Sequence, residues 1–247
     1  MKKYFMLAMI VVFAATGAFA RSSRAARSGN GSNGGRSVHA LGFAVPLQWQ
    51  TWENDDEAMD LSAAGFGIMY HHLDIRPSRF STFMDVQMGY SSFTIDAIDG
   101  HEKNDAGTSW QDLFGSLGGF NTHYVFGIGG APVVADRFTL AVHGTFGAHL
   151  SVALGSTDGW NDVGFESSSF SVDSGLFGFW TTIGANVDAA WRITNRVGVF
   201  AGIDMYINLF GGGMFWFDTP YYNFSDAYLI NPGDFNVSFR VGVAFVY

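Results

Sequence analysis

Three patterns in the 247-residue sequence predict an all-β fold: a closed antiparallel transmembrane β-barrel of eight strands, with ten strands as the alternative. Eight segments alternate between apolar residues and small or polar residues, the connections between them are alternately short and long, and an export signal precedes them. Successive side chains of a strand point to opposite faces. In a membrane barrel the apolar face meets lipid and the polar face lines the interior.

The final segment, residues 234–247, has the clearest alternation. Seven apolar residues share one parity: Phe235, Val237, Phe239, Val241, Val243, Phe245 and Tyr247. Small or polar residues occupy most of the other: Asn236, Ser238, Arg240, Gly242 and Ala244. This segment is therefore predicted to be a strand with one unbroken apolar face.

The opposite end of the chain predicts export. Lys2 and Lys3 precede an apolar run over residues 4–19, and Ala18-Phe19-Ala20 fits a signal-peptidase site. The expected organisation is a signal peptide at 1–20, a flexible basic periplasmic segment at 21–37 and an outer-membrane β-barrel at 38–247. The alternative for the first segment is a retained N-terminal membrane helix. Because the chain has no cysteine, disulfides and lipoprotein acylation are excluded.

Charge excludes another class of function. Lys2, Lys3 and the four arginines of residues 21–37 account for nearly half of the basic residues, which leaves seven of the 13 against all 22 acidic ones. A chain this acidic is not expected to bind nucleic acid. After the signal peptide no segment has about 18 uninterrupted apolar residues, so helical membrane spans are not expected either.

The strands are expected at residues 38–48, 61–73, 79–94, 113–127, 137–152, 176–192, 196–210 and 234–247. The long connections, 51–60, 95–112, 155–175 and 211–233, hold sixteen acidic residues and one base, Lys103. Five arginines lie near the short turns instead: Arg76, Arg79, Arg137, Arg192 and Arg196. Short turns are typical of the periplasmic side, so both termini are predicted to be periplasmic. The ten-strand alternative would place a further hairpin within 155–175 or 211–233, for instance with Met214–Phe217 pairing with Tyr228–Ile230.

The same alternation assigns faces to single residues. We expect these side chains to face lipid: Phe138, Leu140, Val142, Val197, Val199, Ile203, Val241 and Val243. Counting from the short-turn end puts five inward ionisable residues in about one layer: Asp85, His143, Asp188, Asp204 and Arg240. Buried charges must be paired, and Arg240 could bind two carboxylates, Asp204 first. We predict a structural plug, with a proton or ion pathway as the alternative, because eight strands leave little room for water. Inward glycines could either make room for side chains or leave a cavity.

Two resemblances follow from these residues. Arg240, Gly242, Phe245 and Tyr247 resemble the C-terminal assembly signal of bacterial outer-membrane β-barrel proteins, which implies contact with the barrel assembly machinery. The whole region after the signal peptide resembles the small OmpA/OmpX-type eight-stranded barrels in its architecture, which implies an outer-membrane location surrounded by lipid.

A third resemblance concerns catalysis. His149-Leu150-Ser151, with Glu166 downstream, resembles the His-x-Ser and glutamate arrangement of outer-membrane lipid A deacylases. The chain departs from that pattern at Val152, where the family has asparagine, and the alternation turns both residues inward. We therefore expect a non-enzymatic barrel without cofactor, with a structural or surface-interaction role carried by its long acidic and aromatic loops. Surface glycolipid or divalent cations are the expected loop partners. A narrow transport barrel and a deacylase-like enzyme are the alternatives.

Overall fold

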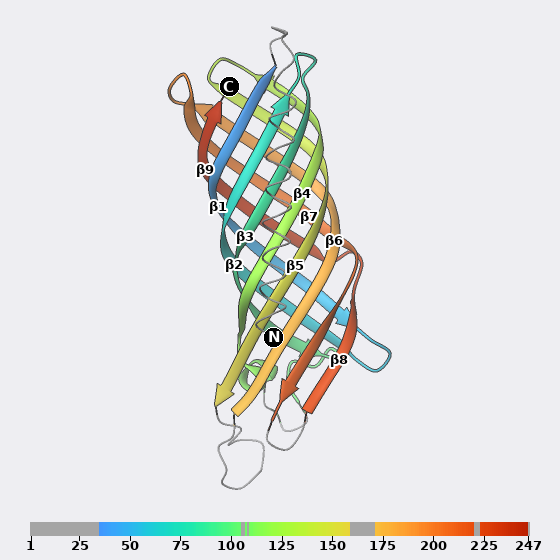
Figure 1. Cartoon of the computed structure of the whole chain (residues 1–247). Helices are drawn as coiled ribbons and strands as arrows, with labels where there is room; N and C mark the ends of the chain where they lie inside the picture. Colours follow the sequence, from blue (N-terminus) through green and yellow to red (C-terminus); the bar gives the residue numbers. More distant parts are fainter. Residues whose placement is uncertain (1–34, 105–106, 108, 159–170, 220–222, 247) are drawn as a thin grey trace, which may run out of the picture. The chain divides into compact units, whose positions relative to one another are not determined.

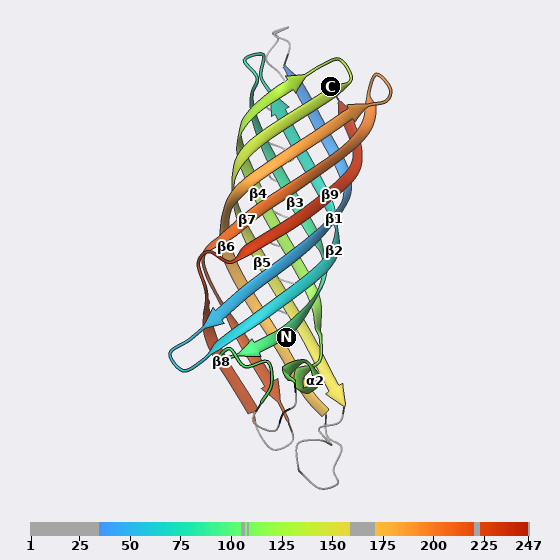
Figure 2. The ribbon, with the colours of Figure 1, turned by 180° about the vertical axis from the view of Figure 1, so that it is seen from behind.

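The computed structural model describes residues 35–104, 107, 109–158, 171–219 and 223–246. The expected signal peptide at 1–20 lies outside these residues, and so does most of the basic segment that follows it. The described elements are β1 (Arg36–Glu53), β2 (Ala58–Ile75), β3 (Phe80–Ile98), α2 (Trp110–Phe114), β4 (Leu117–Val134), β5 (Phe138–Asp158), β6 (Ser171–Arg192), β7 (Val197–Asp218), β8 (Asn223–Ile230) and β9 (Phe235–Val246). Figures 1 and 2 show the tilted strands wound into a closed barrel.

The barrel closes through its last strand. Each strand from β1 to β7 pairs antiparallel with the next, and β9 pairs with both β7 and β1. The β1–β9 register places Gly42 opposite Gly242 and Val38 opposite Val246. The ring therefore consists of β1 to β7 and β9, which confirms the predicted eight-stranded barrel. Strand β1 begins, and β9 ends, at the end that carries the short turns between β2 and β3, β4 and β5, and β6 and β7 (Figure 1).

Strand β8 occupies the same position in the ring as β9, nearer the long-loop end, and does not add a ninth position. It pairs with the far half of β7, where Gly212 lies opposite Leu229 and Asp218 opposite Asn223, and it meets β1 at Trp52. Residues 231–234 separate β8 from β9. A hairpin within 211–233 therefore exists, although Met214–Phe217 pairs with residues 224–227 and not with Tyr228–Ile230. It lengthens the eight-stranded wall at the long-loop end and adds no further position to the ring.

A β-bulge in β7 explains why alternation did not reveal this extension. Thr182 pairs with Asn208, whereas Thr181 pairs with Phe210, so Leu209 is an extra residue in β7. One extra residue exchanges the faces of all residues that follow it. Phe210 consequently points outward and is 63% exposed, and Phe215 points inward and is buried.

The strands are longer than expected, mainly toward the long loops. Strand β5 runs to Asp158 instead of 152, and β7 runs to Asp218 instead of 210. The fourth strand begins at Leu117 rather than 113, because residues 110–114 form the helix α2. At the other end β1 begins at Arg36, two residues before the expected boundary. The Arg36 guanidinium donates 2.8 Å hydrogen bonds to the Ala135 carbonyl and the Thr139 hydroxyl.

The outer wall is apolar over most of its height. Exposed aliphatic and aromatic side chains include residues from β1, β2, β5, β7 and β9: Leu41, Phe43, Phe66, Ile68, Val142, Phe146, Val199, Ile203, Phe239, Val241 and Val243. The eight residues expected to face lipid all have this outward parity. So many exposed apolar side chains around a closed sheet are unfavourable in water, whereas in a membrane they would contact the lipid hydrocarbon. No helix in the described part of the chain is long and apolar enough to span a membrane.

Candidate functional site

The interior holds an ion cluster centred on Arg240 of β9. Its guanidinium contacts Asp85 of β3 through Nη1, lies 2.8 Å from Asp188 of β6 through Nη2, and lies 3.0 Å from Asp204 of β7 through Nε. All four side chains are almost completely buried. Asp204, the first candidate partner, is one of three carboxylates that the barrel brings to the same guanidinium.

A second set of polar groups surrounds this ion cluster. Asn186 donates to Asp204 Oδ1 at 2.7 Å and to Asp188 Oδ1 at 3.1 Å. Gln87 donates to Asp204 Oδ2 at 3.2 Å. His143 lies outside direct contact with Arg240. Its Nδ1 lies 3.1 Å from Asn186 Oδ1 and its Nε2 lies 2.8 Å from the Ser81 hydroxyl.

His71 is a central member of the ion cluster that counting positions did not identify. Its Nδ1 lies 3.1 Å from Asp85 Oδ2 and 3.1 Å from Arg240 Nη1, and its Nε2 lies 3.4 Å from Asp188 Oδ2. The signal for it is present in the strand expected at 61–73, because the apolar Phe66, Ile68 and Tyr70 share one parity and His71 has the other. The imidazole therefore hydrogen-bonds Asp85. Among the described residues, its Nε2 approaches Asp188 without forming a hydrogen bond.

Aromatic rings enclose the charges. The Arg240 guanidinium lies 5.5 Å from the Phe200 ring centre and 6.0 Å from that of Phe83, distances typical of cation–π contact. The His71 ring lies 4.5 Å from the Phe200 ring. This apolar enclosure strengthens the ion pairs and makes any unpaired charge costly.

Apolar layers lie on both sides of the ion cluster. Toward the short-turn end the interior is filled by small and aliphatic side chains, among them Val38, Ala40, Leu73, Ile75 and Val246. Toward the long-loop end it is filled by a larger group that includes Trp52, Met59, Phe93, Leu117, Leu176 and Trp180. Helix α2 adds Leu113 and Phe114 to this second layer. Figure 2 shows α2 at the long-loop end of the barrel.

The aromatic residues of the 211–233 segment contribute to the same layer. Phe215 and Phe217 pack on Phe114, with ring centres 5.5 and 5.4 Å apart, and Phe224 stacks on Phe217 at 5.1 Å. They form part of a cap over the barrel mouth instead of an exposed aromatic surface. Tyr221 and Tyr222 lie outside the described residues.

The inward glycines make room for neighbouring groups. A Cβ at Gly202 would lie 2.6 Å from Asp188 Oδ1 and 2.7 Å from Arg240 Nη2, so the ion cluster fills that space. At Gly184, Gly42 and Gly67 the corresponding space is occupied by the backbone of the adjacent strand. At these positions the glycines allow close packing and leave no cavity.

Among the described residues, no base lies within hydrogen-bonding distance of the Ser151 hydroxyl. The side chains of His149 and Ser151 are buried inside the barrel. His149 Nε2 accepts a 3.0 Å hydrogen bond from the Gln48 amide, and its ring stacks on Trp180 at 4.4 Å. Within the described part of the chain the Ser151 hydroxyl has no hydrogen-bond partner, and Glu166 lies outside that part. A serine needs a base within hydrogen-bonding distance to attack an acyl group.

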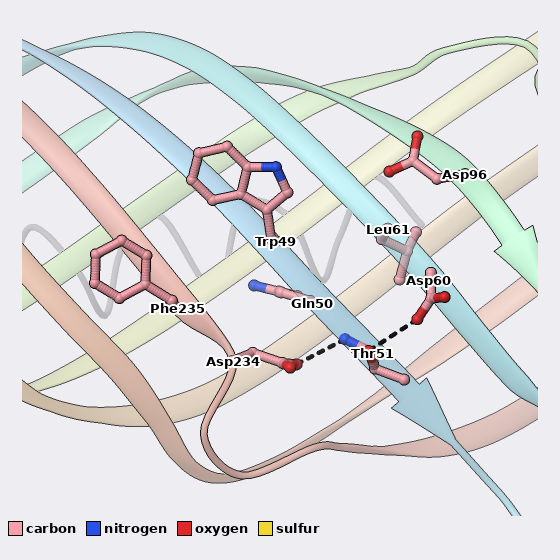
Figure 3. A pocket seen from close by; sticks show the side chains of 8 residues that line it. All are labelled: Trp49, Gln50, Thr51, Asp60, Leu61, Asp96, Asp234 and Phe235. Carbon is pink, nitrogen blue, oxygen red and sulfur yellow. Dashed lines mark hydrogen bonds between the residues drawn. The ribbon is translucent and has the colours of Figure 1, made fainter. Parts of the chain in front are cut away.

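The outer wall has a pocket of about 320 Å³ beside the break between β8 and β9. Asp234 of the break accepts a 2.6 Å hydrogen bond from the Thr51 backbone N–H, and the Thr51 hydroxyl donates to Asp60 at 2.8 Å (Figure 3). Asp96 adds a third carboxylate to the lining, and Trp49 and Phe235 add two rings. Burial raises the pKa of Asp234, and the charges of Asp60 and Glu53 raise it further.

One buried amide also lines this pocket. Gln50 is only 4% exposed, and its Nε2 has no hydrogen-bond partner among the residues that the structure describes. Over those same residues, no group of three or more His, Cys, Asp or Glu side chains is placed to hold a metal ion. The pocket thus offers acidic oxygens, one amide donor and aromatic faces.

The residues of the expected assembly signal have separate surroundings. Arg240 is buried in the ion cluster, Gly242 lies against Gly42, and Phe245 lies on the outer face between His39 and Val197 of the adjacent strands. Tyr247 lies outside the described residues.

Comparison with solved structures supports the fold. The outer membrane protein OprG from Pseudomonas aeruginosa matches with a TM-score of 0.52 at 7% identity, over 88% of this chain and 98% of OprG. A major outer membrane protein from Thermus thermophilus matches with a TM-score of 0.49 at 13% identity, over 84% of this chain and 99% of its own. No protein-family model matches the sequence, and no curated protein matches it. At 7% identity the likeness to OprG concerns the fold, and the chain is an eight-stranded β-barrel of the outer-membrane type.

Proposed function

We propose that the protein is a non-enzymatic outer-membrane barrel with a sealed interior, whose specific role lies at its long-loop end. The observation that carries this proposal is the succession of three filled layers along the barrel axis. The Arg240 ion cluster occupies the middle layer, and apolar side chains fill the layers on either side. An ion crossing this barrel would have to displace both apolar layers and break the ion pairs.

The distribution of charge supports an orientation with the short turns and both termini in the periplasm. Arg76, Arg79 and Arg196 lie at the short-turn end, and the acidic residues Asp55, Asp56 and Glu102 lie at the long-loop end. Short periplasmic turns and longer external loops are the rule for outer-membrane barrels. The long-loop end would then meet the cell surface, and the C-terminal strand would be available to the barrel assembly machinery.

The pocket beside Thr51 supports an interaction role for that surface. Trp49 and Phe235 provide ring faces, and Asp60, Asp96 and Asp234 provide acceptors for hydroxyl or ammonium groups. This combination suits a sugar or amine group of a surface glycolipid. A divalent cation shared between the acidic residues and a glycolipid phosphate is the second partner of this class.

Conductance across a planar lipid bilayer tests the sealed interior. The purified wild type is expected to insert without discrete channel openings, because side chains of the described residues fill all three layers. A triple variant that shortens the enclosing rings and removes the guanidinium, Phe83→Ala/Phe200→Ala/Arg240→Ala, serves as a comparison with a weakened seal. Stable, reproducible openings of the wild type would overturn the proposal in favour of a narrow transport barrel.

Two further measurements address the remaining alternatives. Lipid A from cells that express the protein is expected to keep its acyl chains in mass spectra. Acyl loss that disappears in Ser151→Ala would establish an enzyme.

Binding to detergent micelles that contain lipopolysaccharide is expected to weaken in Asp60→Asn/Asp96→Asn. Equal binding by this variant and the wild type would remove the pocket from the proposed surface role.

A further inference from the structure

Two histidines face each other on the outer wall, at the short-turn end of the barrel. His39 of β1 lies opposite His72 of β2, and their Nδ1 atoms are 3.1 Å apart. The two rings meet edge to face, with centres 4.2 Å apart. On the outward face, His39 lies two residues before the exposed Leu41 of β1, and His72 lies four residues after the exposed Ile68 of β2. The pair is therefore at the edge of the apolar wall, where a membrane surface would meet water.

Three neighbouring groups orient these two rings. Asp74 Oδ2 lies 2.9 Å from His72 Nε2. Because a carboxylate only accepts hydrogen bonds, His72 must carry its proton on Nε2, and its Nδ1 lone pair faces His39. The Tyr70 hydroxyl lies 2.9 Å from His39 Nδ1, and the Ser37 hydroxyl lies 3.3 Å from His39 Nε2.

We propose that His39 and His72 are the two protein ligands of a transition-metal ion, such as Zn²⁺ or Cu²⁺, bound through their Nδ1 atoms. Metal–imidazole bonds are about 2.0–2.1 Å long. Two nitrogens on one ion are then about 2.9 Å apart at a right angle and about 3.4 Å apart at the tetrahedral angle. The observed 3.1 Å lies between these values, so binding needs only small ring rotations. The ion replaces the proton that the two nitrogens would otherwise share.

The surroundings fit a metal site in two further respects. A histidine that binds a metal commonly donates its other N–H to a carboxylate, and Asp74 takes this position beside His72. The phenol oxygen of Tyr70 is close enough to serve as a third ligand after a small movement, and water can complete the coordination. Ions can reach the site from solvent, because the side chain of His72 is 19% exposed and that of Asp74 is 57% exposed.

Metal titration of the tag-free, full-length protein in detergent tests this inference. Calorimetry with Zn²⁺ is expected to show one saturable ion per barrel in the wild type. His39→Ala and His72→Ala should each abolish that binding. His101→Ala changes an exposed histidine outside the pair, and this control should bind like the wild type. Heat-modifiable gel mobility verifies that each variant is folded.

Spectra and a neighbouring variant separate ligation from charge attraction. Bound Cu²⁺ should show nitrogen hyperfine splitting in electron paramagnetic resonance, and both single alanine variants should lose it. Asp74→Asn should weaken the affinity for the metal ion about 10–100-fold and leave the spectrum unchanged, because Asp74 orients the ligand His72 without contacting the ion. Absence of Zn²⁺ binding by the wild type, or unchanged binding by His72→Ala, would overturn the proposal.

Discussion

The guanidinium of Arg240 occupies the space that a side chain at Gly202 would need. A Cβ on Gly202 would lie 2.7 Å from Arg240 Nη2 and 2.6 Å from Asp188 Oδ1. The ion pair between Arg240 of β9 and Asp188 of β6 therefore requires that residue 202 of β7 has no side chain. A single added carbon at this position tests how tightly the interior is packed.

We expect Gly202→Ala to destabilise the barrel by about 1–3 kcal/mol, the usual cost of overpacking a filled core. Gly144→Ala is the matched control, because a Cβ there would have the Ile128 carbonyl oxygen as its nearest neighbour, at 3.9 Å. Urea unfolding in detergent, followed by tryptophan fluorescence, measures both variants. Equal midpoints for the two variants would contradict a filled interior at Gly202.

Removing the central charge should cost more than removing one of its partners. Arg240→Met leaves Asp85, Asp188 and Asp204 without their guanidinium, and breaking a buried ion pair in this way costs about 3–5 kcal/mol. Asp85→Asn removes one of three carboxylates and leaves Arg240 paired with the other two. The same unfolding assay compares them. If Arg240→Met were as stable as the wild type, the ion cluster would not stabilise the barrel.

A substitution at Ile203 of β7 tests which side chains face the lipid. Ile203 is 40% exposed on the outer wall. Arginine at a lipid-facing midplane position costs about 2–4 kcal/mol, so Ile203→Arg should lower stability by that amount in lipid vesicles. Ile203→Leu keeps an apolar surface and serves as the control. Wild-type stability of Ile203→Arg would mean that this part of the wall does not contact hydrocarbon.

A pH-dependent prediction concerns Asp234 in the break between β8 and β9. Burial raises the pKa of its carboxyl in the folded protein, and Asp60 and Glu53 act in the same direction. A group of this kind contributes stability below its unfolded pKa, and that contribution disappears as the pH rises through the folded pKa. Asp234→Asn should therefore be more stable than the wild type at neutral pH, because its amide oxygen can still accept from the Thr51 N–H.

The difference should vanish below about pH 3, where both proteins are neutral at this position. Urea unfolding between pH 3 and pH 8 measures it. Asp55→Asn, at an exposed acidic residue, is the control for a general change of charge. A neutral-pH stability of Asp234→Asn below that of the wild type would show that the charge itself holds the break in place.

Alternation was sufficient to predict the ring of eight strands, because one face of each strand must be apolar in a membrane. It also placed Asp85, Asp188, Asp204 and Arg240 in one layer, and the structure brings these four side chains together. Counting residues from the short-turn end gives the height of a residue along the barrel axis. It does not give the direction in which its side chain points across the interior. For this reason the predicted layer includes His143, whose Nδ1 lies 3.1 Å from Asn186 Oδ1 and 3.9 Å from Asp188 Oδ2.

The remaining features depend on interactions that alternation does not contain. The bulge at Leu209 exchanged the faces of β7, so Phe215 and Phe217 read as loop aromatics although they cap the interior. Helix α2 has five residues, too few for a helical repeat to be visible in the sequence. The pocket beside Thr51 forms only where β8 ends and β9 begins. Asn231-Pro232-Gly233 marks a turn at that point, but alternation does not show that Thr51 and Asp60 of other strands lie beside it.

The position of Arg240 on the last strand also has a consequence for the order in which the barrel folds. Asp85, Asp188 and Asp204 belong to β3, β6 and β7, which all precede β9 in the chain. An open sheet of the earlier strands would contain these three carboxylates without their guanidinium, a costly state wherever water is excluded. When β9 pairs with β1 and β7, closure of the ring and neutralisation of the carboxylates occur in the same step. Closure is thereby made cooperative, and a nearly complete but open sheet gains little of the final stability.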